Sequence, residues 1–166
     1  DVMNRPDSIS NLGTVLGFTA VIRKAYSNIL SYTWVAVGHP NNTYYVPIYM
    51  GAEGLPDFTV DATMWGASES LYKARPEEER LTPHRVLRFD EYEEKMEAEK
   101  VALERKINAL LRCGMISEAR SMLTEWCSAT AQKALETLRW KWILDRLDRT
   151  VGELKEISAE LESTHP

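Results

Sequence analysis

The composition of the chain changes sharply near Tyr72, and this change constrains the fold more than any other feature of the sequence. Residues 1–72 carry ten of the fifteen aromatic residues and six of the eight glycines, but only nine charged residues. The rest of the chain carries thirty-six charges and two glycines. Strands with turns are typical of the first composition and amphipathic helices of the second, so the sequence predicts an α+β fold with segregated elements. We expect one packed domain with three parts: a β-rich sheet layer over 1–73, a connector over 74–89 and a helical segment over 90–166.

Three segments of the first part have the apolar, β-branched composition of strands. They are residues 14–22, 32–37 and 43–49. The turn sequence Gly38-His39-Pro40-Asn41-Asn42 separates the last two, which predicts an antiparallel hairpin. Pro47 has no N–H for a sheet ladder, which restricts its strand to an edge, an end or a bulge. Because these strands are apolar on both faces, we expect a sheet that is covered on both sides.

The second part has the apolar spacing of long amphipathic helices. It predicts a helix over 90–113, with Gly114 in the position that ends a helix. A second helix is expected over 117–147. The sequence Asp148-Arg149-Thr150, followed by Gly152, predicts a break before a third, weaker helix to about residue 162. Together these elements would form an αα-hairpin with a tail, and a short helix is expected earlier, over 61–72.

The sequence carries none of the common motifs of a self-contained catalytic site. HExxH, CxxC, GxSxG, GxGxxG and Walker-type loops are all absent. His39, His84 and His165 have no carboxylate or nucleophile at a motif-like spacing. We interpret His39 and His84 as turn or surface residues, and His165 lies near the C-terminus. Cys113 and Cys127 are interpreted as packing residues on helices. Two cysteines alone cannot build a metal site, and no cofactor or metal is expected.

The charge of the chain argues against two classes of partner. A net charge of −5 does not suit a protein that binds a phosphate backbone, and the apolar runs are far shorter than the ~20 residues of a membrane span. We therefore expect neither nucleic acid nor a membrane as partner. Trp140 and Trp142 lie two residues apart and so face opposite sides of a helix, which predicts that one packs in the core rather than on a base. The two unpaired cysteines slightly favour the cytoplasm.

Three stretches of the first part together have a distinctive pattern. They read SISNLGTV (8–15), SYTWVAVGHP (31–40) and YVPIY (45–49). This order of a small-polar strand entry, a Trp-containing strand with a Gly-x-Pro turn, and a Val-Pro-Ile-Tyr strand resembles the N-terminal-nucleophile (Ntn) hydrolases. That group includes the C69 dipeptidases, the penicillin acyltransferase-like proteins and the choloylglycine hydrolases. The resemblance covers residues 1–72 by pattern and the remainder only by helical character. It implies that the sheet is one layer of an αββα sandwich.

The resemblance also implies a chemistry, the hydrolysis of linear C–N (amide or peptide) bonds. In this group the nucleophile is an N-terminal Cys whose own α-amino group acts as the base. This chain begins at Asp1 with neither cysteine near it, so we expect a C-terminal portion that is inactive alone, with the nucleophile on a missing N-terminal part. The expected partners are that part or a second copy, and a small amide substrate. Arg5 matches the place of a site arginine in choloylglycine-type members, and Asn11 is a candidate oxyanion donor.

Two other functions are consistent with the same residues. In the first, the chain is a non-catalytic interaction module whose helical hairpin, over 90–148, binds a partner helix through Trp126 or Trp142. These indoles would then be exposed in an apolar patch. In the second, the chain carries a small ligand in an aromatic pocket. The pocket would be formed by Tyr32, Tyr44, Tyr45 and Tyr49.

Overall fold

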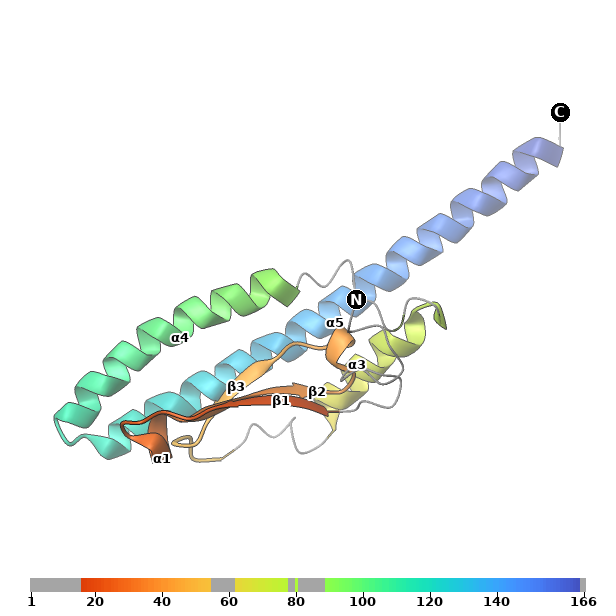
Figure 1. Cartoon of the computed structure of the whole chain (residues 1–166). Coiled ribbons are helices and arrows are strands. Elements are labelled where there is room, and N and C mark those ends of the chain that lie inside the picture. The colour runs from red at the N-terminus through yellow and green to blue at the C-terminus, as the bar shows by residue number, and fades with distance from the viewer. Residues whose placement is uncertain (1–15, 55–61, 78–79, 81–88, 165–166) are drawn as a thin grey trace.

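The structure is a computed structural model of the chain that describes residues 16–54, 62–77, 80 and 89–164. The predicted α+β class is confirmed, with a three-stranded antiparallel sheet followed by helices (Figure 1). The strands are β1 (Leu16–Val21), β2 (Tyr32–Val37) and β3 (Val46–Tyr49), in the order β1-β2-β3. The helices are α1 (Ser27–Leu30), α3 (Thr63–Ala74), α4 (Phe89–Arg112) and α5 (Ile116–Thr164), with a 3-10 turn η2 (Pro40–Asn42).

The predicted hairpin is present as β2 and β3. Trp34 lies opposite Pro47 in the antiparallel register, and β3 is an edge strand, where the missing N–H of Pro47 is tolerated. Gly38 follows β2 with φ +101°, in the left-handed region that favours glycine. A Cβ on Gly38 would also collide with the side chain of Ser68 on α3. The hairpin turn therefore packs directly against α3.

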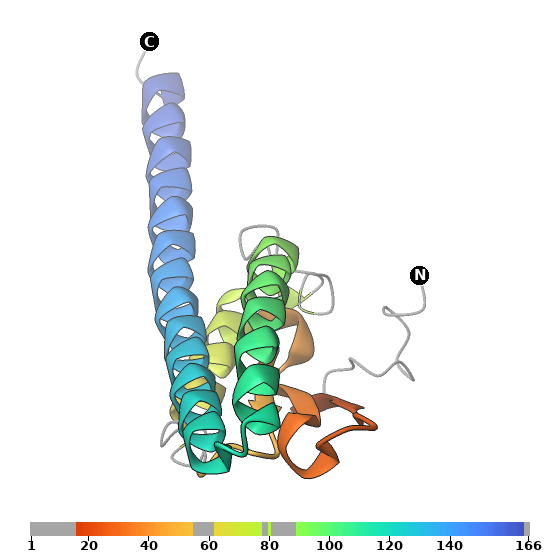
Figure 2. The ribbon, with the colours of Figure 1, turned by 90° about the vertical axis from the view of Figure 1, so that its left-hand side faces the viewer.

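The helices pack against the sheet and its hairpin, and α5 is the central one. It contacts β3, α3 and α4, and the two orthogonal views show α4 and α3 beside it (Figures 1 and 2). One core cluster joins sheet tyrosines to α4 and α5; its members include Tyr32, Tyr49, Leu103, Ile107 and Leu123. A second cluster joins the hairpin to α3 and α5; its members include Tyr44, Val46, Met64, Leu71 and Leu138. Both clusters thus combine residues from both parts of the sequence.

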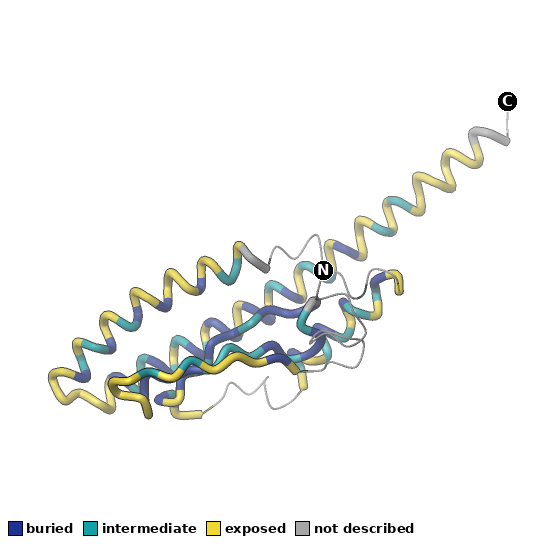
Figure 3. Tube along the Cα trace, viewed as in Figure 1, coloured by how far each residue is buried: buried dark blue, intermediate teal, exposed yellow. Residues whose placement is uncertain are grey.

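One face of the sheet differs from the prediction. Leu16 and Phe18 of β1 are exposed on this face, and Figure 3 shows β1 exposed over most of its length. Val46, which pairs with Val35 and shares its face, is instead buried in the cluster with Met64 of α3. An apolar groove of about 450 Å³ lies on this face. The expectation of a sheet covered on both sides is therefore met only at the hairpin end of this face, and the β1 side is uncovered in the described residues. The described residues also contain no second sheet of an αββα sandwich. A strand that is apolar on both faces can be buried on both, but its composition does not determine whether another element packs on the second face.

The predicted break at 148–152 is also wrong, because α5 runs without interruption over 49 residues. At 1.5 Å per residue this helix is about 74 Å long. A single glycine costs a helix only ~1 kcal/mol relative to alanine, so Gly152 does not end it. Local side-chain interactions support the helix here, because Arg149 pairs with Asp145 at 3.2 Å and the Thr150 hydroxyl donates to the carbonyl of Arg146. By contrast, the predicted turn at Gly114 is present, with φ +75°.

Candidate functional site

The two predicted site residues, Arg5 and Asn11, lie outside the described residues, as do His84 and His165. Their predicted roles stay predictions. In the described part of the chain, the fold brings several polar side chains together between the helices and the sheet.

His39 is buried, whereas the sequence predicted a turn or surface residue. It does precede the η2 turn, but its ring stacks on Tyr72 of α3 with 3.7 Å between ring centroids. Its Nε2 lies 3.0 Å from the carboxylate of Glu69, which also pairs with Lys73. Burial raises the pKa of Glu69, but hydrogen bonds from Lys73 and His39 outweigh this and leave the pKa lowered. The Glu69 carboxylate is therefore held in its ionised form between the Lys73 ammonium and the His39 ring.

Ser68 stands next to Glu69, yet the three side chains do not form a nucleophile–base–acid relay. The Ser68 hydroxyl accepts a hydrogen bond from the backbone N–H of His39 at 3.1 Å, and the imidazole points to Glu69 instead. A general base must lie within hydrogen-bond reach of the proton that it removes. This cluster therefore fastens the hairpin turn to α3.

A second polar cluster joins the sheet to α4. Glu104 of α4 accepts hydrogen bonds from Arg23 at 2.8 and 2.9 Å and from the Tyr49 hydroxyl at 2.7 Å. Burial, followed by this bond to Glu104, raises the pKa of Tyr49 well above its ordinary value. A phenol that keeps its proton cannot act as a base near neutral pH. The Glu104 carboxylate is occupied by three hydrogen bonds within the fold.

One turn earlier on α4, Lys100 is almost completely buried, with 2% of its side chain exposed. Its Nζ donates to the Tyr32 hydroxyl at 2.6 Å, pairs with Glu97 at 2.8 Å, and lies 4.3 Å from the centroid of the Tyr32 ring. Burial lowers the pKa of Lys100, but the bonds to Glu97 and Tyr32 more than compensate and raise it. A nucleophilic lysine needs the opposite, a lowered pKa, so this ammonium is structural.

The two cysteines have different environments. Cys127 is buried in the core, as predicted, and burial raises the pKa of its thiol to about 11. Cys113 is exposed at the end of α4, so its interpretation as a packing residue is wrong.

The described residues contain no group of three or more His, Cys, Asp or Glu that could hold a metal ion. Among the described helices, none has the length and apolar character of a membrane span.

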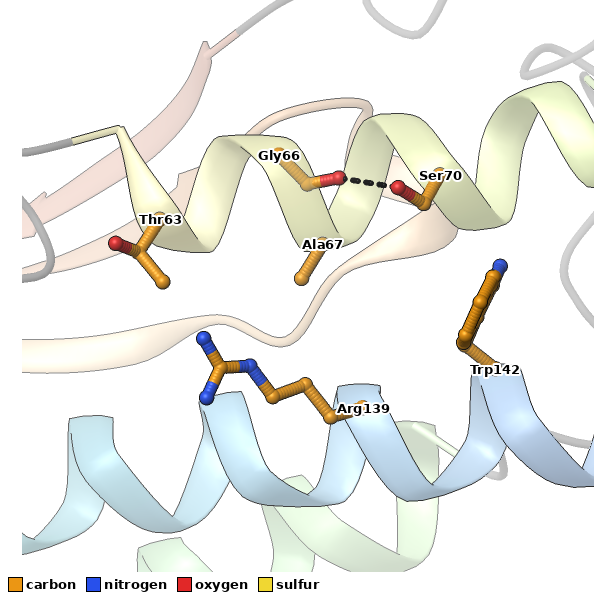
Figure 4. A pocket seen from close by; sticks show the side chains of 6 residues that line it. All are labelled: Thr63, Gly66, Ala67, Ser70, Arg139 and Trp142. Carbon is orange, nitrogen blue, oxygen red and sulfur yellow. Dashed lines mark hydrogen bonds between the residues drawn. The ribbon is translucent and has the colours of Figure 1, made fainter.

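A cleft of about 280 Å³ lies between α3 and α5 (Figure 4). Arg139 and Trp142 of α5 point toward α3 across it, and α3 contributes Thr63, Gly66, Ala67 and Ser70. The Ser70 hydroxyl donates to the backbone carbonyl of Gly66 at 2.8 Å. The lining therefore offers one cation and one aromatic ring, and no base to activate the hydroxyl.

The tyrosines of the ligand-carrier hypothesis mostly fill the interior. Tyr32, Tyr44 and Tyr49 are buried, and Tyr49 packs edge-on against Trp126 of α5 at 6.0 Å. Tyr45 lines a separate surface cleft with Trp34. Because three of the four rings pack in the core instead of enclosing a cavity, the structure contradicts an aromatic pocket made by this group.

The tryptophans of the interaction hypothesis also pack against the body. Trp126 and Trp142 are partly buried, each against a core cluster. Trp140, in contrast, is exposed. The prediction that one member of the pair Trp140 and Trp142 packs in the core is thus confirmed, whereas the predicted contact residues Trp126 and Trp142 are not the exposed ones.

The most distinctive surface begins at Trp140 and follows α5 to its end. We call this row of large apolar side chains the distal stripe; its members are Trp140, Leu144, Leu147, Val151, Leu154 and Leu161. Each is between 45% and 66% exposed. The Arg149 side chain still contacts the Ala74 carbonyl at the end of α3, and the part of α5 beyond it projects from the rest of the molecule (Figures 1 and 3). Soluble chains seldom expose a continuous apolar row of this kind without a partner.

The distal stripe lies on the side of α5 that faces away from the body. Leu138 and Asp145 are buried, and the residues two positions after each of them, Trp140 and Leu147, are exposed. Two residues turn an α-helix by about 200°, which places the exposed pair on the opposite side. The stripe is therefore separate from the surface by which α5 packs on β3 and α3.

The sequence contained the signal for this surface, a spacing of three and four residues from 140 to 154 that continues seven residues later at Leu161. The predicted break at 148–152 divided the pattern and hid it.

No protein-family model, curated protein or solved structure matches the chain.

Proposed function

We propose that this chain is a non-catalytic protein-interaction module that binds a partner helix along the distal stripe. The observation that carries the proposal is the exposure of six large apolar side chains on one side of a helix whose distal part projects from the body. The first five are spaced three or four residues apart, and Leu161 follows Leu154 by seven. Burial of such a face is what normally stabilises an amphipathic helix. A groove-binding or coiled-coil helix presents anchors at this spacing.

The polar clusters of the described residues support a non-catalytic role. Glu69, Lys100 and Glu104 are each held in hydrogen-bonded pairs that tie helices to the sheet or to its hairpin turn. The raised pKa values of Lys100 and Cys127 leave neither amine nor thiol activated at neutral pH. The polar groups in these clusters therefore contribute to stability and not to chemistry.

The Ntn amidohydrolase hypothesis stays a prediction that depends on the resemblance and on Arg5 and Asn11. Its test is the sequence that encodes the parent protein. A Cys at a processing junction ahead of Asp1 would support it.

The interaction proposal is tested by photo-cross-linking of the full chain in the cells that make it. Val151 is replaced by benzoylphenylalanine, and irradiation is expected to give one defined adduct whose second protein is identified by mass. The adduct should disappear when Leu147→Ser and Leu154→Ser are added, since the packed apolar surface is then lost. The same photoreactive residue at Glu156, on the far side of α5, is the matched control. The proposal fails if no adduct depends on the stripe.

A further inference from the structure

We infer that the partner helix is α5 of a second copy of this chain, packed antiparallel along the distal stripe; this inference depends on the proposed function. The proposed register places Leu144 opposite Leu161 of the second copy, Leu147 opposite Ser158, and Val151 opposite Leu154. The two-fold symmetry repeats each contact, so the pairing is closed and adds no further copies.

The first argument is the heptad pattern of the stripe. Leu147, Leu154 and Leu161 repeat at intervals of seven residues, as do Leu144, Val151 and Ser158. The second series precedes the first by three residues, so the two series correspond to heptad positions d and a. Leu at d and Leu or Val at a are apolar residues that pack as knobs into the holes of a facing helix. Ser158 is the one polar residue of the seam and is small enough to face Leu147.

The second argument is the nature of the residues that flank the seam, which selects the direction of the pairing. Asp148 and Lys155 are at position e, whereas Ile143, Thr150 and Ile157 are at position g. In a parallel pair each g position lies beside an e position of the other helix, so Ile143 would face Asp148 and Thr150 would face Lys155. In an antiparallel pair e faces e and g faces g. Only the antiparallel pair groups charged with charged and uncharged with uncharged side chains.

The third argument is charge complementarity, which selects the register. In the proposed register Asp148 of each copy faces Lys155 of the other. A shift of one heptad in one direction places Asp148 against Asp148, and a shift in the other direction places Lys155 against Lys155. Like charges at these positions repel, so both shifted registers are disfavoured. Asp148 and Lys155 are both exposed on the helix and accessible to a second copy.

The position of the stripe is compatible with this arrangement. The stripe faces away from the body, because Leu138 and Asp145 on the other side of α5 are buried. Most of the paired segment over 144–161 lies in the part of α5 that projects from the body (Figures 1 and 2). Antiparallel packing would place the two bodies at opposite ends of the paired helices. The first half of α5, α3 and the sheet would keep the packing described above.

Disulfide trapping of the full chain tests direction and register together. In a Cys113→Ser background, which removes the exposed native thiol, Asp148→Cys and Lys155→Cys are combined. Mild oxidation is expected to give a covalent dimer of twice the 19.0 kDa chain mass. Within one helix the two positions are about 10 Å apart, too far for an intrachain disulfide. The matched control is Arg149→Cys with Glu156→Cys, which has the same spacing on the far side of α5 and should stay monomeric.

A charge exchange provides a second test that needs no cross-link. Lys155→Asp replaces two attractive contacts by two repulsive ones, and sedimentation equilibrium should show dimerisation weakened roughly tenfold. Adding Asp148→Lys restores opposite charges and should return the dimerisation constant to within about threefold of the original. Helical circular dichroism of each variant verifies that the chain is folded.

The outcomes separate this inference from the proposed function. A chain that stays monomeric at all concentrations, a dimer that is not trapped at 148 and 155, or a charge exchange without rescue overturns the antiparallel second copy. If the photo-cross-link at position 151 then joins a different protein in a stripe-dependent manner, the interaction module still stands. If the chain dimerises and both tests behave as described, the second copy is the partner.

Discussion

The hydroxyl of Tyr49 on β3 donates a 2.7 Å hydrogen bond to Glu104 of α4, the carboxylate that Arg23 also binds. This contact ties the edge strand to a helix that is more than fifty residues away in the sequence. Removing the phenolic oxygen leaves a partly buried carboxylate with one donor fewer. Tyr49→Phe should therefore lower the free energy of unfolding by about 1–3 kcal/mol, measured by urea denaturation. Tyr26→Phe, at an exposed tyrosine, is the control and should change it by less than about 0.5 kcal/mol.

The burial of Cys127 predicts a loss of stability at alkaline pH. Its pKa is raised to about 11 from the ordinary 9.0, so the unfolded thiol ionises first as the pH rises. The contribution of the buried neutral thiol to the free energy of unfolding is complete below about pH 9 and is lost as the pH rises through about 11. The loss amounts to about 2–3 kcal/mol. Denaturation at a series of pH values measures it. Cys127→Ala should make the dependence shallower over this range; an equal slope in both proteins would contradict the assignment.

The environment of Lys100 predicts a low reactivity of its amine. Acetylation requires a neutral amine that the reagent can reach, and Lys100 is buried with a raised pKa. In a mild acetylation time course followed by peptide mass spectrometry, Lys100 should react at least about tenfold more slowly than the exposed Lys155. Urea should abolish this difference, because unfolding exposes both amines. Equal rates in the folded chain would show that the ammonium is not held by Glu97 and Tyr32.

The continuity of α5 through Gly152 predicts that alanine is favoured there. A Cβ at this position would meet no atom within 4 Å, and alanine is preferred over glycine inside a helix by up to ~1 kcal/mol. Gly152→Ala should therefore slow amide hydrogen exchange around residues 150–158. Gly51→Ala is the contrasting variant, because its Cβ would lie 2.7–2.9 Å from atoms of Ile29, and it should destabilise the fold. If α5 were broken at residue 152, the first substitution would leave local exchange unchanged.

Several features of the fold could be predicted because they depend on neighbouring residues. The hairpin follows from two apolar strands around a Gly-His-Pro-Asn-Asn turn, and the helical turn follows from a glycine at the end of an apolar period. Pro47, which lacks a donor, restricted its strand to an edge, an end or a bulge, and β3 lies at the edge of the described sheet. The break at 148–152 was inferred from the same local rules and was wrong, since propensities of this size are weak compared with the stability of the helix on either side.

By itself, the sequence determined the α+β class, the antiparallel pairing of β2 with β3, the turn at Gly114 and the burial of Cys127. Only the tertiary structure decided that His39 is buried against Glu69, that Lys100 donates to Tyr32 from 68 residues away, and which tryptophan is exposed. The physical reason is that backbone preference and apolar spacing act over a few residues. The partner of a buried charge, and the side of a helix that stays uncovered, depend instead on how distant elements pack.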